Sequence, residues 1–223
     1  MFEKLKPVGM DPILGLMAAY RADPRDNKID LGVGVYQDDS GRTPVMASVK
    51  RAEAKLMELE TTKSYQGIAG DPDYNLRMMA LLFGADHSIL ESGRIKTIQA
   101  PGGSGALRVG AEVIQRARPG TKLWVGLPTW PNHIPLLGGA GLEIAEYPYY
   151  DLDTHSINEE AMLKTLAQVP AGDMVLLHGC CHNPTGSDLT HDHWDKIADL
   201  ALERGFIPFI DTAYQGLGDG LDE

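Results

Sequence analysis

The sequence has no long hydrophobic run. No apolar stretch approaches the roughly 20 residues that a membrane-spanning helix needs, and the first ten residues, MFEKLKPVGM, contain no apolar segment of a secretory signal. Hydrophobic residues make up 43% and charged residues 23% of the 223 positions, which is ordinary for a globular protein. We therefore expect a cytoplasmic protein without a membrane partner.

Positive charge and cysteine are also scarce. Twenty lysines and arginines stand against 31 acidic residues, and the net charge of -11 would repel a nucleic-acid backbone. The two cysteines, Cys180 and Cys181, are adjacent, which is a poor geometry for a structural disulfide. They have no CxxC or paired-histidine spacing, so no metal site is expected. We interpret them as reduced and buried beside a strand.

Short apolar runs alternate with helical patterns over most of the chain. Such alternation is typical of βαβ units and predicts an α/β fold, a mostly parallel sheet with helices on both faces. The expected strands are residues 95–100, 122–127, 142–147, 173–179 and 206–211.

The N-terminal part has a different pattern. Residues 1–44 are rich in turn signals and predict an arm plus part of a small domain, which leaves residues 45–223 as the large domain. Apolar residues at helical spacing predict a helix over 45–60. A second helix is expected after Asp71 as N-cap, with Pro72 at its first position and Gly84 beyond its end.

The residues that follow each expected strand are the candidates for a site, because ligands bind beyond the carboxyl ends of parallel strands. After 95–100 comes PGGSGALR, which opens a helix. Its glycines let the backbone approach an anion, and the helix start supplies free N–H groups. The nucleotide motifs GxGxxG and GxxxxGK[ST] both fail here. The loop predicts a phosphate cradle, with a ligand-free glycine turn as the alternative.

Two further strand ends carry side chains suited to a ligand. Trp130 stands between two prolines and either packs in the core or stacks on a bound group. Asn183 is held extended by the proline after it, and its amide can donate and accept hydrogen bonds. The string Asn-Pro-Thr-Gly is equally compatible with a plain turn.

The last apolar run ends in Asp211, and Tyr214 follows. A carboxylate at the tip of a buried strand is costly unless it meets a cation or hydrogen-bond donors. One such partner is a protonated heterocyclic nitrogen. Together with the glycine-rich helix start, the indole and the amide, Asp211 predicts a pocket for a phosphorylated aromatic cofactor with a ring nitrogen. Pyridoxal phosphate fits this description.

Seven strings occur in order along nearly the whole chain: MDPILGLMAAYRAD, IDLGVGVYQDDSGRTPV, TTKSYQGIAGDPDY, APGGSGALR, PTWPNH, HGCCHNPTG and IDTAYQG. In this order and spacing they resemble the aspartate/aromatic aminotransferases, which are class I, fold-type-I pyridoxal phosphate enzymes. The resemblance implies the large domain of that fold. It also implies ping-pong transfer of an amino group between an L-amino acid (aspartate, glutamate or aromatic) and a 2-oxoacid.

The same resemblance implies roles for the strand-end residues. Asp211 would hold the pyridine nitrogen protonated, so that the ring can act as an electron sink. Tyr214 and Asn183 would hydrogen-bond the 3-oxygen of the ring, and Asp211 and Tyr214 are the expected catalytic residues of this chain. Gly103 and Ser104 would bind the phosphate, with serine where the family commonly has threonine.

Further contacts are implied with the substrate and with a second subunit. Trp130 would stack on the cofactor ring and help to hold the substrate, whose carboxylate Asn183 and Gly34 would contact. Tyr65 would reach the phosphate of the neighbouring subunit, which implies a homodimer with shared active sites. His133 and His178 resemble residues near the strand-end aspartate, and for both a plain packed histidine remains an open alternative.

One part of the family pattern is missing. No lysine follows Lys196 and no arginine follows Arg204, whereas the family places its Schiff-base lysine and its anion-binding arginines after the Tyr214 region. We therefore expect the N-terminal part of a longer enzyme, truncated before the last strands of its sheet and inactive alone. The run 95–100 would then lack its strand neighbours. Two alternatives are a non-catalytic phosphate-binding or interaction module and another pyridoxal phosphate chemistry, such as a lyase or decarboxylase, on the same fold.

Overall fold

The computed structural model describes residues 2–4, 12–30 and 34–221. The chain divides into two compact units, Met1–Lys63 and Ser64–Glu223, and each is described by itself. Parts of the predicted N-terminal arm, residues 5–11 and 31–33, lie outside the described residues. None of the described helices is long and apolar enough to cross a membrane.

The described residues of the first unit form two helices, α1 (Pro12–Ala22) and α2 (Ala47–Leu59). The helix expected over 45–60 is confirmed in α2, although none of its residues is buried. Between the helices, the Asp38 side chain accepts hydrogen bonds from the backbone N–H groups of Ser40 and Arg42, at 2.9 and 3.0 Å, and so fixes a tight turn.

The second unit begins with helix α3 (Pro72–Phe83), which the sequence predicts closely. Asp71 caps it by accepting a hydrogen bond from the Tyr74 N–H at 2.9 Å, and Gly84 ends it with a φ of 85°. That dihedral angle is one that glycine adopts without the steric cost other residues meet. A short 3₁₀ turn, η1 (Ser88–Leu90), follows.

Four strands form a parallel sheet in the order β2-β1-β5-β6. They are β1 (Lys122–Leu127), β2 (Glu143–Pro148), β5 (Met174–His178) and β6 (Ile207–Asp211). Each lies where an apolar run predicts it. The helices between them are α4 (Gly102–Ala117), α5 (His133–Gly138), α6 (Glu159–Leu166) and α7 (His191–Arg204).

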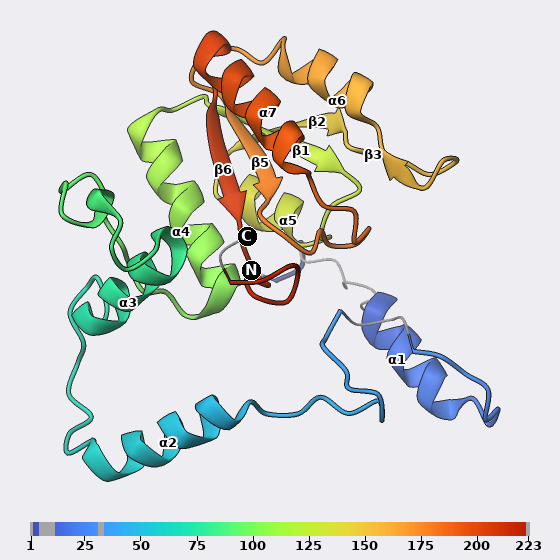
Figure 1. Ribbon diagram of the computed structural model, residues 1–223. Coiled ribbons are helices and arrows are strands. Elements are labelled where there is room, and N and C mark those ends of the chain that lie inside the picture. The colour runs from blue at the N-terminus through green and yellow to red at the C-terminus, as the bar shows by residue number, and fades with distance from the viewer. Residues whose placement is uncertain (1, 5–11, 31–33, 222–223) are drawn as a thin grey trace. The chain divides into compact units, whose positions relative to one another are not determined.

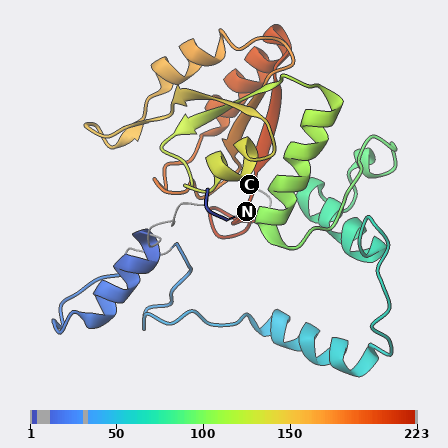
Figure 2. The same cartoon turned by 180° about the vertical axis from the view of Figure 1, so that it is seen from behind.

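The sheet is covered on both faces, as the α/β prediction requires. Figure 1 shows α7 on the near side of β5 and β6, and Figure 2, from behind, shows α4 on the other side. Alternate residues of β5 serve the two cores: Val175 packs with Ile197 of α7, and Leu176 packs with Leu107 of α4. The central strand is therefore apolar on both faces, which explains its unbroken hydrophobic run.

One expected strand is absent. Residues 95–100 form no strand in the described chain, and the backbone N–H of Gln99 instead donates to the carbonyl of Ala69 at 2.9 Å. An apolar run becomes a strand only when a neighbouring strand takes up its N–H and C=O groups. The described residues supply no such neighbour, and β6, at the edge of the sheet, leaves Ile207 and Ile210 about half exposed.

A small hairpin was not predicted from the sequence. Strands β3 (Tyr150–Asp151) and β4 (Ser156–Ile157) pair antiparallel. The Asp151 side chain accepts hydrogen bonds from the N–H groups of Asp153 and Thr154, at 2.8 and 3.0 Å, within the connecting turn. The string Asp-Leu-Asp-Thr is thus a turn signal, but strands of two residues are too short to produce a period-two pattern.

Candidate active site

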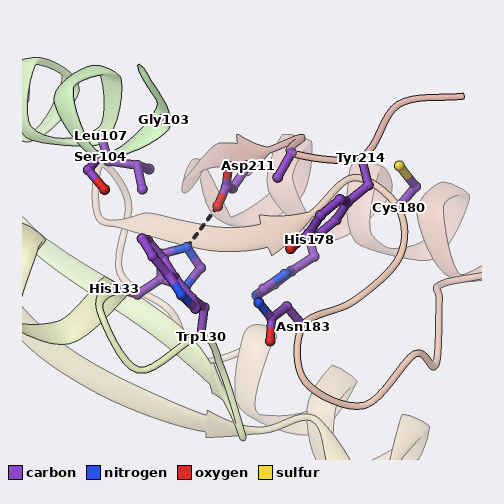
Figure 3. A pocket seen from close by; sticks show the side chains of 11 residues that line it. Gly103, Ser104, Leu107, Trp130, His133, His178, Cys180, Asn183, Asp211 and Tyr214 are labelled. Carbon is purple, nitrogen blue, oxygen red and sulfur yellow. Dashed lines mark hydrogen bonds and ion pairs between the residues drawn. The ribbon is translucent and has the colours of Figure 1, made fainter. Parts of the chain in front are cut away.

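The carboxyl ends of β1, β5 and β6 and the start of α4 surround one pocket of about 300 Å³ (Figure 3). It lies where ligand sites of parallel sheets are expected. Its lining includes six of the eight residues predicted from the sequence, together with five others. The eleven are Gly103, Ser104, Leu107, Trp130, His133, His178, Cys180, Asn183, Asp211, Ala213 and Tyr214.

The other two predicted residues do not line this pocket. Tyr65 is fully exposed in the segment before α3. Its predicted contact is with a neighbouring subunit. Gly34 belongs to the first unit, where it is exposed. The catalytic, cofactor-binding and substrate-binding roles of all eight residues stay predictions.

The glycine-rich loop forms the first turn of α4. Pro101 occupies the N-cap position, and no side chain of the described residues caps this helix start. The first N–H groups of α4 are therefore without a side-chain acceptor, at the positive end of the helix dipole. Ser104 adds a hydroxyl beside them, and the start of α4 borders the pocket in Figure 3. The arrangement suits an anion such as a phosphate group.

Asp211 lies at the end of β6, and its side chain is 23% exposed. Its Oδ2 atom is 2.8 Å from Nε2 of His133, which is the first residue of α5 and fully buried. An ionised carboxylate only accepts hydrogen bonds, so Nε2–H of His133 is the donor. The described residues give the other oxygen of Asp211, Oδ1, no hydrogen-bond donor, and this oxygen can accept from a bound group.

Two further hydrogen bonds connect His133 to Thr129 and Thr129 to His178. The Nδ1 atom of His133 lies 2.7 Å from the hydroxyl of Thr129, which also lies 3.1 Å from Nε2 of His178. In the tautomer assignment that satisfies all three contacts, Nε2–H of His133 donates to Asp211, Nδ1 of His133 accepts from the Thr129 hydroxyl, and that oxygen accepts from Nε2–H of His178. In this assignment each of the three hydrogen bonds donates its proton in the direction of the Asp211 carboxylate. The network thereby defines the tautomers of the two histidine rings and holds Asp211 in one orientation.

His178 is held in its neutral form. Burial lowers its pKa to about 3, and the neighbouring rings of His182 and His133 act in the same direction. His178 is the last residue of β5 and pairs in register with Asp211 of β6. The structure thus brings both histidines into one hydrogen-bonded network with Asp211.

Trp130 and Asn183 enter the pocket from two loops. The indole of Trp130 meets the ring of His133 edge-on, with centroids 5.2 Å apart and planes at 87°. Trp130 is half-buried, so one of its faces is available to a flat ligand. Asn183 follows β5 and its side chain lies near His178 in Figure 3.

The cysteines differ from expectation in one respect. Both are free, as expected, but they are half-buried and not buried. They follow the end of β5, where the chain leaves the sheet for the pocket rim, and Cys180 lines the pocket beside Tyr214. Partial burial raises the pKa of the Cys180 thiol, and the adjacent Cys181 acts in the same direction.

Sequence reasoning missed Thr129, which links the two histidines. Its spacing of four residues from His133, across the start of a helix, is a signal that could have indicated it. The described lining of the pocket contains no lysine or arginine. No group of three or more His, Cys, Asp or Glu side chains among the described residues is placed to hold a metal ion.

Comparison with known proteins gives a consistent result. The family model described as "Aminotransferase class I and II" matches residues 26–222. An aspartate aminotransferase of Salmonella typhi is 48% identical over the whole chain, and an aromatic-amino-acid aminotransferase of Pseudomonas aeruginosa is 50% identical. The chain covers 56% and 55% of these two proteins, so it spans about half the length of the curated relatives it matches.

Solved structures agree in fold. An aromatic amino acid aminotransferase from Burkholderia cenocepacia matches with a TM-score of 0.95 and 44% identity, over 99% of this chain and 56% of that one. The aromatic-amino-acid aminotransferase from Burkholderia pseudomallei matches with a TM-score of 0.94 and 39% identity, over 99% and 55%. The latter structure is covalently bound to pyridoxal phosphate.

Proposed function

Because this chain belongs to the family of class I and II aminotransferases, we propose that the protein is a pyridoxal-phosphate-dependent aminotransferase. It transfers an amino group between an L-amino acid (aspartate, glutamate or an aromatic amino acid) and a 2-oxoacid. The observation that carries the proposal is the carboxylate of Asp211, which lines the pocket. One of its oxygens is fixed by His133 at 2.8 Å, and the other has no hydrogen-bond donor among the described residues.

The donor set of the pocket fits the proposed cofactor. The start of α4 and the Ser104 hydroxyl offer donors to a phosphate. Oδ1 of Asp211 can accept from a protonated ring nitrogen. The amide of Asn183 and the phenol of Tyr214 can donate to a ring oxygen, and the half-buried indole of Trp130 can cover the ring face.

The cofactor, when bound, supplies an electron sink for the negative charge left when the substrate loses its α-proton. The residues of this chain maintain the conditions for that chemistry. Asp211 keeps the proton on the ring nitrogen, because an adjacent negative charge favours the protonated form. His133 and Thr129 hold Asp211 in position, and His178, kept neutral by burial, adds no positive charge that would oppose the ring proton.

Three residues are proposed to contact the substrate. Trp130 and Asn183 would hold the substrate beside the ring, and Gly34, in the first unit, would contact the substrate carboxylate. The proposal includes both acidic and aromatic substrates, because the relatives include an aspartate aminotransferase and an aromatic-amino-acid aminotransferase.

The lysine that forms the Schiff base would come from outside these 223 residues. No lysine lines the pocket among the described residues, so we expect the 223-residue chain to bind the cofactor without turnover. No observation favours a non-catalytic module.

We also propose a domain organisation, a location and an oligomeric state. Residues 1–44 form an arm and part of a small domain, and residues 45–223 form the cofactor-binding large domain. The protein is cytoplasmic, and it is a homodimer in which Tyr65 contacts the cofactor phosphate in the partner's site.

Two measurements test the proposal. The first is calorimetric titration of the chain with pyridoxamine 5'-phosphate, which needs no lysine to bind, and we expect saturable binding. The second uses the full-length protein of which we propose these 223 residues to be the N-terminal part. Purified with pyridoxal phosphate it should be yellow, and glutamate or aspartate should bleach the colour and release the 2-oxoacid. Absence of binding in the first measurement and of bleaching in the second would refute the proposal.

A further inference from the structure

The side chain of Asn183 is not held by any hydrogen bond within the described residues, although it lines the pocket. Its orientation therefore depends on where the backbone places it. The proline after it restricts the backbone on one side. On the other side stands His182, a buried residue that the proposed chemistry does not use.

His182 is fixed through its ring, through Nδ1 and through its backbone. Its ring lies parallel to that of Tyr149, with centroids 4.2 Å apart and planes at 8°, and 4.1 Å from the ring of His178. Its Nδ1 atom lies 2.9 Å from the hydroxyl of Thr185. Its backbone N–H donates to Asp188 at 2.7 Å. Only 3% of His182 is exposed, so these contacts replace water almost completely.

The turn around Asn183 is closed by the same neighbours. Asp188 accepts from the N–H groups of both Cys181 and His182, each at 2.7 Å. Cys181 has a φ of 48°, a left-handed conformation that costs energy for a residue with a side chain. Two consecutive N–H groups converging on one carboxylate stabilise that conformation. The Tyr149 hydroxyl donates to the carbonyl of Ser187 and ties the far end of the turn to the same buried ring.

We propose that His182 is a positioning residue for Asn183: stacked between Tyr149 and His178 and hydrogen-bonded to Thr185, it fixes the backbone that presents the Asn183 amide to the pocket. The inference rests on the proposed function, because the ligand of Asn183 is there the 3-oxygen of the cofactor ring and the carboxylate of the substrate. His182 acts through Asn183 and touches no ligand itself.

A double-mutant cycle separates positioning from a merely structural role. We measure affinity for pyridoxamine 5'-phosphate by calorimetry in the full chain, in His182→Ala, in Asn183→Ala and in the double variant. His182→Ala should weaken binding about 3- to 10-fold, the factor expected when one hydrogen bond loses its geometry. In the Asn183→Ala background the same change should add less than about twofold. His191→Ala, the same chemical change at an exposed position of α7, should leave the affinity unchanged.

Two results would overturn the inference. One is wild-type affinity in His182→Ala, and the other is an equal loss in both backgrounds, which would mean that His182 acts independently of Asn183. If His182→Ala does not fold, Thr185→Val takes its place in the cycle, because it removes only the hydroxyl bonded to Nδ1 of His182 and the N–H of Ser187.

A second readout keeps the inference apart from the proposed function. Should the wild-type chain bind no pyridoxamine 5'-phosphate, the cofactor proposal fails, and amide hydrogen exchange decides the positioning role instead. The N–H groups of Asn183, Thr185 and Gly186 should then exchange faster in His182→Ala than in His191→Ala. Equal exchange rates in the two variants would refute a positioning role for His182.

Discussion

Among the described residues, Asp211 carries the only carboxylate that lines the pocket, and its environment limits the cost of placing a carboxylate there. His133 satisfies one oxygen, and the side chain keeps 23% of its surface exposed, so the cost of burying the charge is only partly incurred. The lining supplies no lysine or arginine within the described chain. The second oxygen therefore has capacity for a positive donor that the pocket itself does not provide.

Replacing Asp211 by asparagine tests this charge without disturbing the packing. In Asp211→Asn an amide oxygen can still accept from His133, so circular dichroism and the thermal midpoint should change little. Affinity for pyridoxamine 5'-phosphate should fall roughly 10- to 100-fold, because hydrogen bonds to charged groups contribute about 1.5–3 kcal/mol. Calorimetry measures the loss, and Asp219→Asn, in the exposed C-terminal segment, is the matched control. Equal affinity in both variants would contradict the assigned role.

Helix α4 owes its start to two glycines with different constraints. Gly102 has a φ of 71°, which favours glycine for the backbone alone. At Gly105 the constraint is space, because an added Cβ would meet Cδ and Cγ of the Pro101 ring at 2.9 Å. At Gly103 an added Cβ would meet nothing within 4 Å. The Pro101 ring therefore leaves no room for a side chain at Gly105.

Alanine at Gly105 and alanine at Gly103 should therefore change the stability differently. Gly105→Ala should lower the free energy of unfolding by about 1–3 kcal/mol, since the rigid proline ring must move to admit the methyl group. Gly103→Ala should be neutral or stabilising by up to about 1 kcal/mol, because alanine is the better helix former and the space is open. Urea unfolding followed by circular dichroism measures both. Equal losses would show that the Pro101 contact does not decide the start of α4.

The stability of the molecule should depend on pH through its buried histidines. Burial lowers the pKa of His178 to about 3 and that of His182 to about 4, whereas a histidine in the unfolded chain titrates near 6.5. Between these values the unfolded chain binds more protons than the folded chain, so unfolding becomes easier as the pH falls. The ion-paired carboxyls of Glu159 and Asp192, whose pKa values are lowered by Lys196, add their losses only below about pH 4.5.

The thermal midpoint of the full chain should consequently fall steadily from pH 6.5 to pH 4.5, before the carboxyl groups contribute. His182→Phe keeps an aromatic ring between Tyr149 and His178 and removes one of the two titrating groups. The decline of its midpoint with pH over this window should be shallower than in the unchanged chain. Differential scanning calorimetry at constant ionic strength makes the comparison, and parallel declines would mean that His182 is not kept neutral by its surroundings.

The sequence alone was informative where local pattern and chemistry coincide. Continuous apolar runs located β1, β2, β5 and β6, because strands buried on both faces need no polar alternation. Asp71 and Gly84 gave the bounds of α3 for equally local reasons. Six of the predicted residues line the pocket because each lies at the end of a strand, a few residues beyond it, or at the start of a helix, and parallel strands bring such positions to one edge of the sheet.

The tertiary structure decided what depends on partners distant in sequence. Residues 95–100 have the composition of a strand, and the resemblance already implied that this run would lack its strand neighbours. The structure shows what replaces them: the backbone N–H of Gln99 donates to the loop carbonyl of Ala69. The hydrogen-bonded network from Asp211 through His133 and Thr129 to His178 joins three strand ends, and its contacts from His133 to Asp211 and from Thr129 to His178 link residues 78 and 49 positions apart, which no local spacing indicates. Side-chain identity thus determined which chemistry the chain can perform, and packing decided which groups meet, because contact is a property of the folded chain and not of its order.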